Sequence, residues 1–169
     1  MQANKQYTEA RYDERLQAQT LEWMGQHEEH LTHACTFTME QFDGNLTAEQ
    51  AWKQWERFCK YLNRKIYGNA AKLHGKTLLI LPVLHGEISY KNLHIHAAIG
   101  CVDDRSYGFA ELKTIIDTAW REMKWAKNDI EIVQYRDINW IDYMLKESVR
   151  LDLHSVDLTR CCIAKTLQQ

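Results

Sequence analysis

Long apolar runs are missing from this 169-residue chain. No segment approaches the roughly 20 apolar residues that a membrane-spanning helix needs, so we expect no membrane partner. The opening residues MQANKQYTEARYDERL also lack the apolar centre of a secretory signal. We therefore expect a cytoplasmic protein.

Linker sequence and paired cysteines are scarce as well. The chain has one proline, Pro82, and no internal repeat or tract rich in proline, glycine or serine. Its five cysteines form an odd set without a Cys-x-x-Cys pair, which argues against a disulfide framework or a zinc ribbon. We expect a single domain over residues 1–169, with reduced cysteines and no disulfide partner.

Neither sign of charge dominates the whole chain, because the net charge is −2. The distribution is uneven: the net charge is −6 over residues 1–56, +6 over residues 57–127 and −2 over residues 128–169. One stretch has six basic residues and no acidic one: Arg57, Lys60, Arg64, Lys65, Lys72 and Lys76. Such a patch suits a polyanion, so these residues are candidate DNA contacts. A solvated helix face is the alternative.

The apolar residues recur with two different periods. Alternation and β-prone composition predict strands over 33–38, 77–84, 93–99 and 130–135. Helical spacing predicts helices over 8–30, 109–126 and 139–151, and a further helix from the capping pair Thr47 and Gln50 to about Tyr67. Pro82 indicates that its strand lies at an edge or contains a bulge. After the first helix the order is β-α-β-β-α-β-α, which favours an α+β fold with helices on a mainly antiparallel sheet.

The segment HGEISYKNLHIHAAIG at 85–100 contains the candidate metal ligands. His94 and His96 are two residues apart in a predicted strand, so both imidazoles leave one face of the sheet while Ile95 points into the core. Two neutral imidazoles on one face can donate lone pairs to one cation. Hydrogen-bonded surface histidines are the alternative interpretation.

A hairpin turn centred on residues 90–91 would bring a carboxylate to the same face. Glu87 then lies opposite His94, and His85 opposite His96, with Cβ atoms about 5 Å apart. One carboxylate and two imidazoles suit Mg²⁺ or Mn²⁺ and leave positions open for phosphate oxygens. We therefore expect Glu87, His94 and His96 to bind a divalent metal, with His85 as a reserve ligand.

A second histidine group, His27, His30 and His33, lies near the end of the first predicted helix in an acidic, polar stretch. We interpret this group as a solvated helix end rather than a zinc site.

The segment WIDYMLKE at 140–147 contains the candidate nucleophile. Tyr143, Lys146 and Glu147 share one face of a predicted helix, at spacings of three and four. A metal that polarises a phosphodiester, with an ammonium nearby, would allow Tyr143 to attack phosphorus and form a phosphotyrosine. The alternative is a half-buried tyrosine with Lys146 in solvent. Tyr135, at the end of a predicted strand, is expected to pack rather than to react.

Together these motifs resemble those of the HUH endonucleases, in particular the single-tyrosine Rep initiators of plasmids and small DNA viruses. The His-hydrophobic-His motif is His94-Ile95-His96, and the Tyr-x-x-Lys motif is Tyr143-Met144-Leu145-Lys146. The family's first motif, a strand of the Phe-Thr-Leu-Thr type, is approximated by Cys35-Thr36-Phe37-Thr38. Glu87 stands seven residues before His94, as a glutamate does in parvoviral Rep nuclease domains. The tyrosine follows the histidines, as in Rep proteins and transposases and unlike in relaxases.

The resemblance covers about residues 33–150 and implies a ferredoxin-like (RRM-like) sheet, with the histidines on a central strand and the tyrosine on an adjacent helix. It divides the domain into a helical extension at 1–32, a catalytic core at 33–150 and a tail at 151–169. The implied activity is Mg²⁺- or Mn²⁺-dependent, site-specific nicking and rejoining of single-stranded origin DNA, as at the start of rolling-circle replication. Tyr143 would form the covalent 5′-phosphotyrosine, and Lys146 would contact the scissile phosphate. No GxxxxGK[ST] loop is present, so a host helicase and polymerase are expected partners, in the host cytoplasm if the chain is viral or plasmid-encoded.

Two other functions remain open on sequence grounds. One is an HUH transposase acting on single strands, which the Tyr-x-x-Lys helix disfavours. The other is a ferredoxin-like nucleic-acid-binding module without catalysis, in which the basic residues and aromatic residues such as Tyr61, Tyr67 and Trp125 would bind single strands by charge and stacking.

Overall fold

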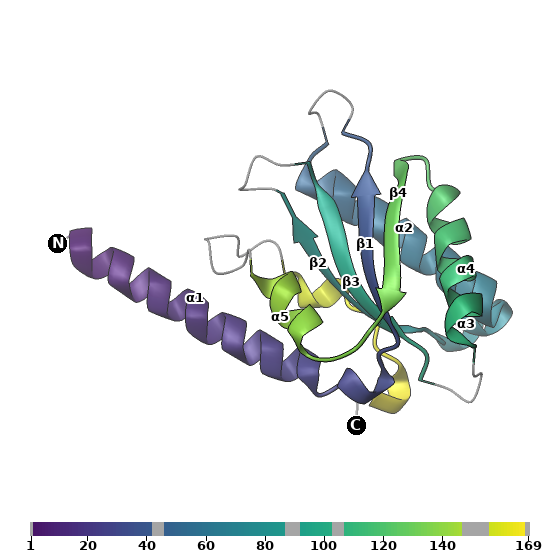
Figure 1. Ribbon diagram of the computed structural model, residues 1–169, viewed down its shortest axis with the longest axis horizontal. Helices are drawn as coiled ribbons and strands as arrows, with labels where there is room; N and C mark the ends of the chain where they lie inside the picture. Colours follow the sequence, from purple (N-terminus) through teal and green to yellow (C-terminus); the bar gives the residue numbers. More distant parts are fainter. Residues whose placement is uncertain (1, 42–45, 87–91, 103–106, 147–155, 168–169) are drawn as a thin grey trace.

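A four-stranded antiparallel sheet lies at the centre of the computed structural model, which describes residues 2–41, 46–86, 92–102, 107–146 and 156–167 (Figure 1). The strands, in the spatial order β2-β3-β1-β4, are β1 (His33–Met39), β2 (Leu79–His85), β3 (His94–Gly100) and β4 (Ala126–Gln134). The α-helices are α1 (Gln2–Gly25), α2 (Ala48–Tyr67), α3 (Asn69–His74), α4 (Phe109–Arg121) and α5 (Asn139–Leu145). Short 3₁₀ helices are η1 (Glu28–His30), η3 (Leu158–Arg160) and η4 (Lys165–Leu167). The chain is therefore an α+β protein with an open antiparallel sheet, consistent with the predicted ferredoxin-like arrangement.

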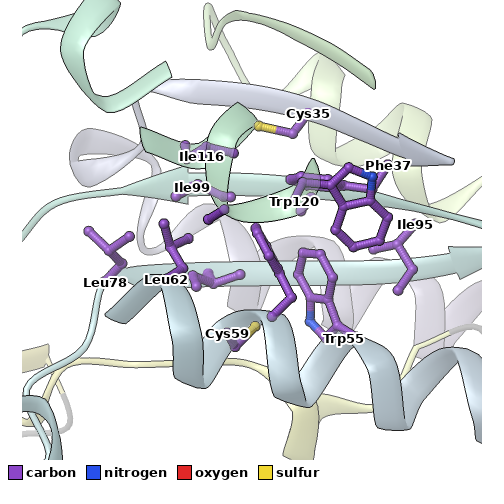
Figure 2. Close-up of a cluster of buried hydrophobic side chains, with 14 of the residues drawn as sticks. Cys35, Phe37, Trp55, Cys59, Leu62, Leu78, Ile95, Ile99, Ile116 and Trp120 are labelled. Carbon is purple, nitrogen blue, oxygen red and sulfur yellow. The ribbon is translucent and has the colours of Figure 1, made fainter. Parts of the chain in front are cut away.

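One face of the sheet is covered by α2 and α4, and the space between is filled by large aromatic side chains (Figures 1 and 2). Phe37 from β1 lies 5.2 Å from Trp55 of α2 and 4.9 Å from Trp120 of α4, measured between ring centroids. Ile95 of β3 is buried in the same cluster, so the predicted inward direction of this residue is confirmed. Complete burial of several aromatic rings makes this face the main hydrophobic core.

The predicted start of α2 is confirmed. The Thr47 hydroxyl accepts a hydrogen bond from the Gln50 backbone N–H at 3.2 Å, and the Gln50 side chain accepts one from the Thr47 backbone N–H at 3.0 Å. This reciprocal pair satisfies two backbone donors that a helix N-terminus otherwise leaves unpaired.

The opposite face of the sheet carries α1 and α5. Ile141, Met144 and Leu145 of α5 pack with Val83 of β2 and Ala98 of β3 in a second buried cluster. The two clusters separate because successive residues of a strand point to opposite faces. Any side chain on an even-numbered position of β3 therefore lies under α5 rather than under α2.

Several predicted boundaries differ from the structure. The helix predicted over 109–126 ends at Arg121, because Ala126 already pairs with Met39 of β1, and the strand predicted over 130–135 therefore begins at Ala126. The helix predicted over 8–30 ends at Gly25. The sequence did not predict α3, a six-residue helix that lies between Gly68 and Gly75, both with positive φ. For the helix predicted over 139–151, α5 confirms the first half, and most of the rest lies outside the described residues.

The edge position predicted for the strand with Pro82 is confirmed, because β2 is the outermost strand next to β3. On its outer side Ile80 exchanges two backbone hydrogen bonds of 2.9 Å with Cys162, so a short part of the C-terminal segment covers the edge. No helix in the described part of the chain has the length and apolar character needed to cross a bilayer.

Candidate metal centre

Three histidines converge where β2 ends and β3 begins. His85 is the last residue of β2, and His94 and His96 leave β3 on the face that carries α5. One ligand atom from each of the three lies within 4.8 Å of the others. His85 and His96 are only 1% and 4% exposed, whereas His94 is half-buried. Neutral imidazoles so close together could hold a metal ion in a site open to solvent on the His94 side.

The strand register differs from the predicted register by two residues. His94 lies opposite His85, and His96 lies opposite Val83, whereas the sequence predicted that His85 would lie opposite His96. A shift of two preserves the face on which each side chain lies, so the predicted grouping of the histidines survives. His85, expected as a reserve, is thus a full member of the cluster. Glu87, the expected third ligand, lies outside the described residues.

Hydrogen bonds on the far side of the rings orient two of the histidines. Nδ1 of His94 lies 2.8 Å from the Asn92 carbonyl oxygen, and Nε2 of His85 lies 2.5 Å from the Met144 carbonyl oxygen. A carbonyl can only accept, so these nitrogens carry the hydrogens, and the lone pair of a neutral ring lies on the other nitrogen. Metal-binding histidines in proteins usually have such outer partners, which fix the tautomer and the ring orientation.

His96 is held in the same manner by a side chain of the neighbouring strand. Its Nδ1 lies 3.0 Å from the hydroxyl oxygen of Thr36, which is its partner position on β1. When the hydroxyl accepts from Nδ1–H, Nε2 carries the lone pair. Thr36 belongs to the strand that carries the expected first motif, but its contact with His96 was not predicted. The available signal was the hydroxyl of Thr36 within a predicted strand.

The environment of His96 keeps its imidazole neutral. Burial is the main cause of a lowered pKa, and the neighbouring His85, His94 and Lys146 contribute repulsion, so the pKa of His96 falls to about 3. A ligand histidine must be neutral to donate its lone pair. His96 therefore meets this requirement throughout the physiological pH range.

Tyr143 lies directly beside this cluster. Its ring is 5.3 Å from the His96 ring, centroid to centroid, and its side chain is 43% exposed. Nζ of Lys146 lies 3.5 Å from the centroid of the Tyr143 ring. The predicted nucleophile, the predicted lysine and two of the predicted ligands are thus brought together on one face of the sheet.

Trp140, one turn before Tyr143 on α5, fixes this part of the helix against the sheet. Its indole N–H donates to the Ala97 carbonyl oxygen at 3.3 Å. Its ring stacks on Tyr143 at 5.5 Å and meets the edge of His96 at 5.6 Å. No role for Trp140 was predicted from the sequence, in which its spacing of three from Tyr143 was the available signal.

The basic residues expected to contact DNA lie elsewhere. Those on α2 and α3 are over the sheet face opposite to the histidines (Figure 1). Lys65 is engaged in an ion pair of 3.1 Å with Glu122. Four of the six line a pocket near the C-terminal segment: Lys60, Arg64, Lys72 and Lys76. The structure therefore does not bring this basic patch together with the candidate metal centre.

The aromatic residues expected to stack on single strands are largely occupied. Tyr67 is buried in the core, and the partly buried Trp125 packs against the same cluster. The Tyr61 hydroxyl donates a hydrogen bond to Glu122. Because stacking on a base needs an exposed ring face, Tyr67 is not available for it, whereas Tyr61 and Trp125 are partly exposed.

Two histidines outside the cluster, His33 and His27, are buried and have structural contacts. His33 is buried, stacks on Phe109 with a centroid distance of 4.6 Å, and its Nε2 lies 3.0 Å from the Phe109 carbonyl oxygen. His27 is also buried and meets the edge of Trp23 at 5.5 Å. The expectation of a solvated helix end is therefore wrong for these two residues. Tyr135 is buried as predicted, and burial together with Glu28 raises its pKa.

The fold and the site together define an α+β protein with an antiparallel sheet and a three-histidine cluster that could hold a metal ion. Compared with protein-family models, with curated proteins and with solved structures, the chain matches none of them.

Proposed function

We propose that the protein is an HUH-type DNA endonuclease that nicks and rejoins single-stranded DNA through a covalent bond to Tyr143. The observation that carries this proposal is the position of one exposed phenol, 5.3 Å from the ring of His96 in a three-histidine cluster. Lys146 adds a cation within 3.5 Å of the same phenol ring. Nucleophile, metal ligands and a phosphate-binding cation are the parts that a phosphodiester transfer needs.

In the proposed reaction the Tyr143 oxygen attacks the phosphorus of a single-stranded phosphodiester. A tyrosyl O–P bond forms as the P–O3′ bond breaks, and the electron pair leaves on O3′, which takes up a proton. The phenol loses its proton in the same step, so charge and atoms balance. The products are a 5′-phosphotyrosine and a free 3′-OH, and attack by a 3′-OH reverses the step without an external energy source.

The residues of the chain have separate roles in this scheme. Trp140 holds the Tyr143 ring by stacking, and the helix that carries both is tied to β2 through the Met144 carbonyl and His85. Lys146 would contact a non-bridging phosphate oxygen, because its ammonium lies over the ring that attacks. Buried His96 and partly buried Thr36 would form the base of the site.

His85, His94 and His96 would hold a divalent cation, which when bound would polarise the phosphodiester as a Lewis acid. Both Mg²⁺ and Mn²⁺ are candidates from the sequence. Mg²⁺ prefers oxygen ligands, whereas imidazole is a better ligand for first-row transition ions. We therefore propose Mn²⁺ as the better fit to the three-histidine cluster.

The proposed substrate is single-stranded origin DNA at the start of rolling-circle replication. A free 3′-OH would then serve as the primer for a host polymerase, and a host helicase would supply the single strand. In this scheme one tyrosine would carry both half-reactions, so the same protein would also rejoin strands.

The proposal is tested by trapping the covalent adduct. The full chain is incubated with Mn²⁺ and a random-sequence single-stranded DNA library labelled at the 3′ end, because the downstream fragment would remain on the protein. We expect a labelled band that resists denaturation, and we expect its complete loss in Tyr143→Phe. Tyr61→Phe is the matched control on the other side of the sheet and should retain the adduct. Adduct formation by Tyr143→Phe, or none by the wild type, would contradict the proposal.

A further inference from the structure

A second candidate site lies on the side of the sheet remote from the histidines. It is a pocket of about 490 Å³ between α2, α3 and the C-terminal segment around η3. Its lining includes five basic side chains, Lys60, Arg64, Lys72, Lys76 and Arg160. The pocket is thus formed by two consecutive helices and a C-terminal segment that is distant from them in the sequence.

The charge of this lining is strongly unbalanced. Glu56 is the one acidic residue among the lining residues, and its carboxylate forms an ion pair with Arg160. Lys60, Arg64 and Lys72 are exposed, and none of the three has an acidic partner within the part of the chain that the structure describes. Concentrated positive charge with one compensated carboxylate attracts a ligand with negative charge.

The floor of the pocket differs from its charged rim. Cys59 and Ala71 contribute apolar surface from the two helices, and the buried Trp55 lies next to Cys59 on α2 (Figure 2). Thr77 and Thr159 add hydroxyl groups to the wall.

The volume of the pocket favours an organic anion over a bare inorganic ion. Small-molecule sites usually measure about 300–1,000 Å³, so this pocket exceeds the needs of a bare phosphate ion. A basic rim suits a phosphate group, and an apolar floor suits a flat heterocycle. We propose that this pocket binds a nucleotide, with the phosphate at Arg64 and Lys72 and the base against the apolar surface of Cys59 and Ala71, either as a free nucleotide or as one unit of a single strand. The site is separate from the candidate metal centre and would bind whether or not the protein cuts DNA.

The test measures binding of two probes to the full chain, thymidine monophosphate by calorimetry and a fluorescent oligonucleotide of ten thymidines by anisotropy. Both are repeated in a His96→Ala background, so that contacts at the metal centre do not contribute. The test variant is Arg64→Glu with Lys72→Glu. The control is Lys53→Glu with Lys124→Glu, which makes the same change of charge at exposed positions outside the pocket. Circular dichroism verifies folding, and Lys60→Gln with Arg64→Gln is a milder second variant.

We expect saturable binding of at least one probe, weakened at least ten-fold by the pocket variants and less than two-fold by the control. Binding of the mononucleotide would identify a free nucleotide as the ligand, and binding of the oligonucleotide alone would identify a single strand. Three results would overturn the proposal: no saturable binding of either probe, equal losses in control and pocket variants, or inorganic phosphate competing as strongly as the nucleotide.

Discussion

His85 has two contacts that connect the candidate metal centre with the helix of the candidate nucleophile. Its ring lies 4.4 Å from the His96 ring, and its Nε2 donates to the Met144 carbonyl oxygen of α5. Tyr143 is the neighbour of Met144 in that helix. A single buried side chain thus fixes both the ligand cluster and the distance between that cluster and the phenol.

We predict that His85→Ala lowers the affinity for Mn²⁺ by at least about ten-fold, as much as His94→Ala does, because each removes one of three nitrogen donors. The affinity is measured by electron paramagnetic resonance of free Mn²⁺ during a titration. His74→Ala on α3 is the control, since His74 is exposed and remote from the cluster. An unchanged affinity in His85→Ala would mean that His85 is not a ligand.

At the residue scale, the sequence could predict the sheet face on which each histidine lies. It could not predict which residue of the neighbouring strand lies opposite each histidine. The period of two in a strand fixes the face of His94 and His96, whatever the turn. Any even shift of register keeps that face, so alternation could not distinguish His94 from His96 as the residue opposite His85. The proximity of Tyr143 to His96 depends on how α5 packs on the sheet, and no local pattern in the sequence encodes it.

At the element scale, helix and strand identities follow from periodicity, whereas boundaries depend on tertiary contacts. The spacing of Met123 and Ala126 continues the helical pattern of α4, but pairing of Ala126 with Met39 ends the helix at Arg121. The capping box at Thr47 is a local signal, so the start of α2 was predictable. The six residues of α3 are too few to produce a clear periodic signal.

The end of β3 provides a test of element packing. A Cβ atom on Gly100 would clash with the His30 carbonyl oxygen, so η1 or β3 would have to shift. We predict that Gly100→Ala lowers the free energy of unfolding by about 1–3 kcal/mol, the usual cost of overpacking. Urea denaturation measures this quantity.

Gly108→Ala is the matched control for this prediction. Gly108 has an ordinary φ of −61°, and a Cβ there would meet nothing within 4 Å. Its substitution should leave the urea midpoint almost unchanged. Equal effects of the two substitutions would contradict the close approach of η1 and β3.

At the scale of the whole molecule, the sheet separates two kinds of surface. The histidine cluster and Tyr143 lie on the side of α5, and the pocket with Lys60 and Arg64 lies on the side of α2. The excess of positive charge in residues 57–127 was visible in the sequence. The location of this charge in the fold was not visible in the sequence, because the charges along a helix do not reveal which face of a sheet that helix covers.

The stability of the whole molecule should depend on pH through buried histidines. Burial, the largest effect, lowers the pKa of His33 in the folded protein. In the unfolded chain a histidine has a pKa of about 6.5, so below that pH the unfolded state binds more protons. The free energy of unfolding therefore decreases as the pH falls from about 6.5 toward the folded-state pKa, by at most about 1.4 kcal/mol per pH unit from this residue.

Urea denaturation of metal-free protein between pH 7.5 and pH 5 tests this dependence. His33→Gln should make the decrease shallower, because it removes one group that takes up a proton on unfolding. His74→Gln, at an exposed position of α3, is the control and should retain the wild-type slope. A wild-type slope in His33→Gln would show that His33 is not the group responsible.

The proposed reaction depends most on the identity of the nucleophile, which mass spectrometry can determine. After incubation with Mn²⁺ and single-stranded DNA, the adduct is digested with nuclease and then with trypsin. Tryptic cleavage releases DINWIDYMLK, residues 137–146, in which Tyr143 is the one tyrosine. We predict that this peptide gains the mass of a 5′-linked nucleotide on Tyr143. A nucleotide on any other residue, with an unmodified peptide at 137–146, would contradict the account.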